Sequence, residues 1–112
     1  MLSIPPGSRI FVCREAVDTR KSFDGLAAAA QARLGQEPSS GAYFVFVSRR
    51  RKLLKILRWE GDGYAIWSKR LERGQSSLPA PGASPALLDL RELHMVLDGI
   101  RSARFYRRYH NP

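Results

Sequence analysis

Short apolar runs separated by polar or glycine-rich segments are typical of β-strands, and the chain contains several of them. A first run spans residues 9–14 and is closed by an arginine at each end. Residues 43–47 are apolar at every position, which favours a central strand covered on both faces. Further runs at 53–59 and 64–71 flank Gly61-Asp62-Gly63, where we expect a tight hairpin turn with a positive φ at Gly63. The pattern therefore predicts an antiparallel meander of three strands over about 42–72.

Two segments have the apolar spacing of helices, at about 20–34 and 90–98. Asp18 or Ser22 can cap the start of the first, and Gly35 suits its end. The buried face expected for this helix consists of Phe23, Leu26, Ala27, Ala30 and Leu34. The second helix opens on a capping box, Asp89-Leu90-Arg91-Glu92, and ends at Gly99. Its expected apolar side consists of Leu90, Leu93, Val96 and Leu97.

These elements predict an α+β fold: an antiparallel sheet of four to five strands packs against the first helix, and the second helix lies near the C-terminus. Residues 75–86 are rich in Pro, Ser and Gly and indicate an irregular loop. We expect one domain over 1–100, because no second apolar core is visible, and a basic, aromatic tail over 101–112.

The charge of the chain narrows the range of partners. Lys and Arg number 19 against 10 Asp and Glu, giving a formal net charge of +9. So large a surplus in a small domain favours binding to a polyanion. No apolar stretch approaches the length of a membrane span, the first residues lack the pattern of a signal peptide, and Cys13 is the single cysteine. We therefore expect a cytoplasmic protein without a membrane partner.

The cations gather in a few places. Six of the ten residues from 49 to 58 are cationic, at a turn and along the strand that leaves it. Alternation along that strand places Lys55 and Arg58 on opposite faces. Arg20 and Lys21 precede the first helix, whose first backbone amides can hold a phosphate or simply belong to a capping loop. The expected nucleic-acid-binding residues are Arg20, Lys21, Arg49, Arg50, Arg51, Lys52, Lys55, Arg58, Lys69 and Arg70.

Nearby aromatic residues have two interpretations. Trp59, Tyr64 and Trp67 can stack on bases or belong to the core, and the core is favoured because aromatics dominate core burial. The basic and aromatic tail suits single strands or RNA, but it is equally consistent with a frayed terminus.

Catalytic patterns are weak in this sequence. Neither His94 nor His110 lies in a recognisable motif, and there is no Cys/His spacing for a metal and no glycine-rich phosphate loop. We therefore expect no enzymatic activity, no cofactor and no metal. One alternative is a small basic ribonuclease toxin of the messenger-cleaving type, for which Arg104, Tyr109 and His110 superficially fit.

Three blocks in this order resemble a known family. The first is Asp18–Leu26, the second is Phe44-Val45-Phe46 followed by Arg49-Arg50 and Lys55, and the third is Trp59–Tyr64 followed by Lys69–Gly74. Over roughly residues 5–100 the chain is similar to the accessory protein encoded by the second open reading frame of the IS66 family of bacterial insertion sequences, the TnpB type. Where that family often has Gly-Asp at the tip of the basic turn, this chain has Arg51-Lys52, which strengthens the interpretation of a polyanion partner.

The resemblance implies a role in transposition beside a separate DDE-type transposase, and no catalysis by this chain. The partners that it implies are DNA, at the ends of the element, and the transposase of the same element. A second alternative is a pure interaction module whose basic face meets an acidic patch on the transposase.

Overall fold

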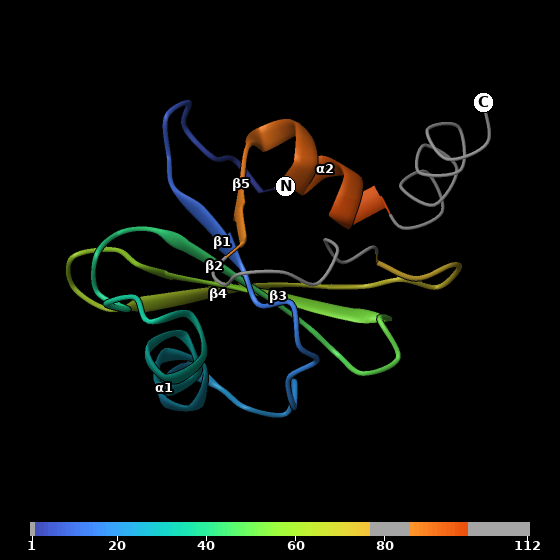
Figure 1. Ribbon diagram of the computed structural model, residues 1–112, viewed down its shortest axis with the longest axis horizontal. Helices are drawn as coiled ribbons and strands as arrows, with labels where there is room; N and C mark the ends of the chain where they lie inside the picture. The colour runs from blue at the N-terminus through green and yellow to red at the C-terminus, as the bar shows by residue number, and fades with distance from the viewer. Residues whose placement is uncertain (1, 77–85, 99–112) are drawn as a thin grey trace.

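The computed structural model describes residues 2–76 and 86–98. In chain order the elements are β1 (Ile10–Val12), α1 (Phe23–Leu34), β2 (Tyr43–Val47), β3 (Leu53–Trp59), β4 (Tyr64–Arg70), β5 (Ala86–Leu88) and α2 (Leu90–Asp98). The five strands form one sheet in the order β4-β3-β2-β1-β5 (Figure 1). The α+β class and the two helices are therefore confirmed. The tail at 101–112, and most of the expected loop at 75–86, lie outside the described residues.

The expectation of a purely antiparallel sheet was wrong. β1 pairs with β2 in parallel, with Ile10 opposite Tyr43 and Val12 opposite Val45. The physical reason is the long connection, because parallel neighbours need a crossover of a dozen or more residues and α1 supplies it. The meander itself is confirmed, since β2–β3 and β3–β4 are antiparallel. β5 completes the other edge, antiparallel to β1, and begins at Ala86 within the segment expected to be loop.

The sheet lies between the two helices, with α1 on one face and α2 on the other (Figure 1). β2 shows the consequence of this arrangement, because all five of its residues are buried. Phe44 and Phe46 point into the core on the α1 side, whereas Tyr43, Val45 and Val47 belong to the core on the α2 side. The unbroken apolar run of β2 therefore marks a central strand, as the sequence predicts.

The helix ends follow the expected local signals. Gly35 has the left-handed conformation at φ 63°, and its N–H donates to the Gln31 carbonyl at 3.1 Å. Ser22 is the N-cap of α1 but makes no side-chain cap hydrogen bond. The capping box of α2 is confirmed: the Glu92 N–H donates to the Asp89 carboxylate at 2.8 Å, and the Asp89 N–H donates to Glu92 Oε1 at 3.1 Å.

Two local expectations were wrong. Phe23 is 46% exposed, because it is the first residue of α1 and precedes the first buried position, Leu26, by nearly one turn. In the hairpin between β3 and β4 the positive φ is at Gly61, at 96°, and Gly63 lies outside the left-handed region. A positive φ at the first central position alone is the pattern of a type II′ turn, which fits two-residue hairpins.

Candidate nucleic-acid interface

The parallel pairing of β1 and β2 places the carboxyl ends of both strands side by side. The loop after β1 then remains attached to the end of β2, because the N–H of Cys13 donates to the Val45 carbonyl at 2.9 Å and the N–H of Val17 donates to the Val47 carbonyl at 3.0 Å. Val17 is itself buried on the α1 side of the sheet. The residues that follow it therefore lie beside the β2–β3 turn.

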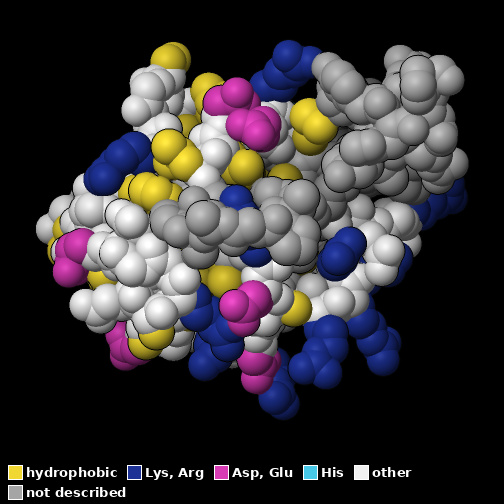
Figure 2. All heavy atoms as spheres, viewed as in Figure 1, with side chains coloured by type: hydrophobic (Ala, Val, Ile, Leu, Met, Phe, Trp, Pro, Cys, Tyr) yellow, Lys and Arg dark blue, Asp and Glu magenta, His cyan; other side chains and the backbone are white. Residues whose placement is uncertain are grey.

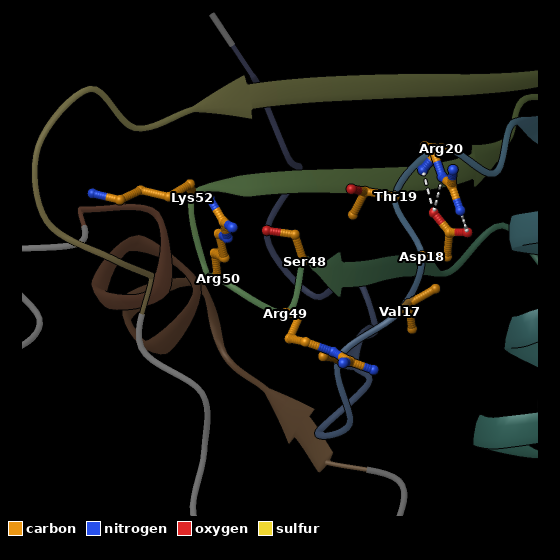
Figure 3. Close-up of a pocket in the computed structure, with 9 residues that line it drawn as sticks. Val17, Asp18, Thr19, Arg20, Ser48, Arg49, Arg50 and Lys52 are labelled. Atoms are coloured by element: carbon orange, nitrogen blue, oxygen red, sulfur yellow. Dashed lines mark hydrogen bonds and ion pairs between the residues drawn. The ribbon is translucent and has the colours of Figure 1, made fainter.

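A pocket of about 460 Å³ lies between this loop and this turn (Figure 3). We call it the basic pocket. It contains four of the cations expected from the sequence, Arg20, Arg49, Arg50 and Lys52. The remaining lining residues are Ala16, Val17, Asp18, Thr19 and Ser48. Two segments far apart in the sequence thus bring their charges to one hollow, at the carboxyl ends of neighbouring parallel strands, where ligands commonly bind in open α/β sheets.

The turn that carries the arginines is fixed by local hydrogen bonds. The N–H of Arg51 donates to the Ser48 carbonyl at 2.8 Å, and the hydroxyl of Ser48 accepts from the Leu53 N–H at 3.1 Å. Arg51 occupies the left-handed region at φ 59°, which is uncommon for a residue other than glycine. This conformation closes the turn and leaves Arg49 and Arg50 at its two central positions.

The segment after β4 braces the same turn from outside. The carbonyls of Arg50, Arg51 and Lys52 accept hydrogen bonds from Gln75, Ser76 and Leu71, respectively, over 2.7–3.0 Å. In turn, the Lys52 ammonium donates a hydrogen bond to the Gly74 carbonyl at 2.6 Å. The backbone of the turn is therefore held in place before any partner arrives, which reduces the entropic cost of binding.

The charges at the basic pocket are only partly neutralised. Arg20 pairs with Asp18, with Nη2 2.9 Å from Oδ2, and its hydrogen bonds lower the pKa of the Asp18 carboxyl to about 2. In Figure 3 the Arg20 guanidinium is turned to Asp18, at the opposite side of the pocket from Arg50 and Lys52. Arg49 and Arg50 are exposed, and no carboxylate within the described part of the chain pairs with either. Figure 2 shows Lys and Arg side chains gathered at the lower edge of the molecule, where this loop and this turn lie in Figure 1.

Three other expected cations, Lys21, Lys55 and Arg70, lie on the α1 side of the sheet. The Lys55 ammonium donates to the Lys21 carbonyl at 3.1 Å, which ties the start of α1 to the middle of β3. Arg70 stands opposite Leu53 in the β3–β4 register and lies 3.6 Å from a carboxylate oxygen of Glu72. Arg51 is exposed at the turn but does not line the basic pocket.

The last two expected cations lie on the other side of the sheet. The Arg58 guanidinium stacks over the ring of Tyr43 at 4.9 Å, and Tyr43 belongs to the core on the α2 side. The Lys69 ammonium donates to the carbonyl of Leu97 in α2 at 3.3 Å. The opposite orientation of Lys55 and Arg58 expected from alternation is therefore confirmed, and the ten candidate residues do not form one continuous surface.

The aromatic residues near the hairpin pack against the protein. Trp59 and Tyr64 meet edge to face, with ring centroids 4.9 Å apart. Tyr64 packs on the core of the α1 side, and Trp67 packs on that of the α2 side. Tyr64 and Trp67 therefore pack on the cores as expected, whereas Trp59 is half-buried and belongs to neither core cluster.

Sequence reasoning did not single out Ala16, Val17, Thr19 or Ser48 as site residues. Nothing in their own identity indicates a site. They line the pocket because β1 pairs in parallel with β2. Only a prediction of that strand pairing from the sequence would have indicated them.

Within the described residues, no group of three or more His, Cys, Asp or Glu side chains is placed to hold a metal ion. None of the helices in that same part of the chain has the length and apolar character needed to cross a membrane.

Comparison with known proteins agrees with the resemblance found in the sequence. The family model described as IS66 Orf2 like protein matches residues 8–107. The chain belongs to the IS66 Orf2-like family. This is an accessory, non-catalytic family associated with insertion sequences. Arg104 lies within the matched span, and Tyr109 and His110 lie beyond it; all three lie outside the described residues, so the structure places none of the residues of the ribonuclease alternative.

Two relatives come from Sinorhizobium fredii (strain NBRC 101917 / NGR234). The uncharacterized protein y4hO is 31% identical over 99 residues, covering 87% of this chain and 86% of the relative. The uncharacterized protein y4jC is 29% identical over 108 residues, covering 96% and 92%. The match is therefore nearly end to end in both cases. No solved structure matches the chain.

Proposed function

We propose that this IS66 Orf2-like protein is a non-catalytic, cytoplasmic accessory protein that supports transposition by binding DNA at the basic pocket. The observation that carries the proposal is that four cations line one pocket, of which Arg49 and Arg50 stand exposed at its turn. Arginine forks pair bidentately with phosphate oxygens, and Arg49 and Arg50 have no carboxylate partner in the described residues.

The second partner in this proposal is the DDE-type transposase of the same element. Family membership supports this partner, since an accessory protein acts beside the enzyme that carries out strand transfer. We assign the basic pocket to DNA rather than to the transposase because its charge is concentrated in arginines on a fixed turn, and because the whole chain carries a net charge of +9.

The test is a salt series of DNA binding with an Arg49→Gln/Arg50→Gln double variant. If both side chains contact phosphates, the slope of log affinity against log salt becomes shallower by about 0.9 for each lost duplex contact. A matched control, Arg9→Gln/Arg73→Gln, removes the same charge at two exposed residues outside the pocket lining and should leave most of the binding intact. Fluorescence anisotropy of labelled element-end DNA measures the affinity.

Two outcomes would contradict the proposal. Equal loss in both double variants would mean that net charge alone governs DNA binding. Unchanged DNA binding in the Arg49/Arg50 variant, combined with loss of transposase in a pull-down, would favour the interaction module, in which the same arginines meet an acidic protein surface.

A further inference from the structure

The basic pocket is larger than a phosphate requires. A phosphate group is only a few times the size of a water molecule, whose share of liquid volume is about 30 Å³. The volume of about 460 Å³ instead lies in the range of roughly 300–1,000 Å³ that is usual for pockets that enclose small molecules. An open hollow of this volume can take a group larger than a phosphate.

The walls of the pocket suit a flat, partly polar group. Ala16, which is exposed, supplies apolar surface from the loop after β1, where Val17 is buried in the core, and Thr19 adds a hydroxyl. Arg49 and Arg50 stand on the opposite wall, and the planar guanidinium of arginine can stack on a base as well as bind phosphate. Figure 3 shows the side chain of Arg49 extending from the turn toward the side of the pocket where Val17 lies.

The pocket should distinguish duplex DNA from DNA with unpaired nucleotides. In a duplex the bases are paired and stacked inside the helix, so only phosphates and groove edges can meet a protein surface. An unpaired nucleotide can place its base inside a hollow of this size.

We propose that the basic pocket takes one unpaired nucleotide of DNA, with its phosphate at Arg49 and Arg50 and its base against Ala16. This inference rests on the proposed function, since it names the form of DNA that the same site selects. The protein then prefers single strands, or duplexes with an unpaired end, over blunt duplexes of the same sequence.

The experiment compares three labelled DNAs at one salt concentration: a single strand, the blunt duplex, and that duplex with a short unpaired end. We expect the unpaired forms to bind roughly tenfold more tightly, in line with the contribution of stacking one base on a side chain. Ala16→Trp fills the hollow without changing the charge, so it should remove this preference. Ala28→Trp is the matched control, because Ala28 is an exposed alanine of α1 outside the pocket.

Thr19→Phe is a second filling variant, used if Ala16→Trp melts at a lower temperature than the control. Equal affinity of the unfilled protein for all three DNAs overturns the inference and leaves the proposed function standing, as does a preference that survives both filling variants. Failure to bind any of the three DNAs overturns the proposed function together with the inference.

Discussion

Nη2 of Arg20 lies 2.9 Å from Oδ2 of Asp18, and Nε of the same arginine lies 3.0 Å from Oδ1. Both residues line the basic pocket, so one of its four cations is held by an acid of its own loop. A phosphate that approaches Arg20 must compete with this carboxylate. The pair is exposed to solvent, which makes exchange of one anion for another inexpensive.

Replacing Asp18 with Asn is therefore expected to strengthen DNA binding. The change frees the Arg20 guanidinium and removes a negative charge from the pocket. In a salt series the slope of log affinity should steepen by up to about 0.9, the value for one additional duplex phosphate contact. Glu15→Gln is the matched control, because Glu15 pairs with Arg33 away from the pocket lining.

The pKa of Asp18 adds a condition on pH. Because Arg20 lowers that pKa from 3.8 to about 2, the carboxylate is ionised throughout neutral and mildly acidic conditions. Its favourable pairing is lost only as the pH falls through about 2 in the folded protein. The difference in affinity between Asp18→Asn and the unmodified protein should therefore be constant from about pH 5 to pH 8. A difference that shrinks over this range, or that Glu15→Gln reproduces, would contradict a local role for Asp18.

The hairpin between β3 and β4 permits a test of backbone conformation. Gly61→Ala should lower the free energy of unfolding by about 1–3 kcal/mol, because Gly61 has φ 96° and a Cβ atom makes this conformation costly. Gly63→Ala should change it by less than about 1 kcal/mol, since a Cβ atom at Gly63 meets nothing within 4 Å and φ there is ordinary. Urea denaturation of the two variants measures both values. Equal destabilisation by the two changes would contradict the assignment of the positive φ to Gly61 alone.

The exposure of Phe23 gives a prediction about the core. Phe44→Ala should destabilise the protein by about 3–5 kcal/mol, the usual cost of emptying a fully buried phenylalanine site. Phe23→Ala should cost far less, because half of its surface already faces water and it contributes to neither core cluster. Thermal melts of both variants compare them directly. A large loss of stability from Phe23→Ala would mean that α1 begins against the sheet after all.

The capping box of α2 should be measurable in the same way. Asp89→Ala removes the acceptor of the Glu92 N–H and should cost about 0.5–2 kcal/mol. Glu92→Gln keeps an oxygen that can accept from the Asp89 N–H, so it should be nearly neutral. Because a loss of 1 kcal/mol lowers the melting temperature of a domain of this size by roughly 4–8 °C, the two variants are distinguishable by calorimetry.

Local signals in the sequence predicted most of the elements. The apolar run of β2, the left-handed Gly35 and the reciprocal bonds between Asp89 and Glu92 depend on neighbours within a few residues, and all three appear as expected. The error at Phe23 arises because periodicity shows which side of a helix is apolar but not where along its length the helix meets the sheet.

The site was harder to predict because it depends on long-range pairing. The sequence showed clusters of cations around Arg20 and Arg49. In a purely antiparallel sheet nothing requires these two clusters to lie close together, whereas the parallel pairing of β1 with β2 does. The same limit explains why Lys69 was grouped with Arg70. Adjacent strand residues point to opposite faces, and neither of the two lines the basic pocket.

The parallel contact between β1 and β2 also has a consequence for the order of folding. The meander from β2 to β4 joins neighbours in the sequence, so it needs little loop closure, and it already contains the turn with Arg49 and Arg50. The other wall of the basic pocket, residues 16–20, is positioned only when Ile10 pairs with Tyr43. We expect this step to be slower, because the two residues are separated by the whole helical connection. A nucleic acid that touches both walls binds only the completed chain, and by mass action it stabilises the contact that closes last.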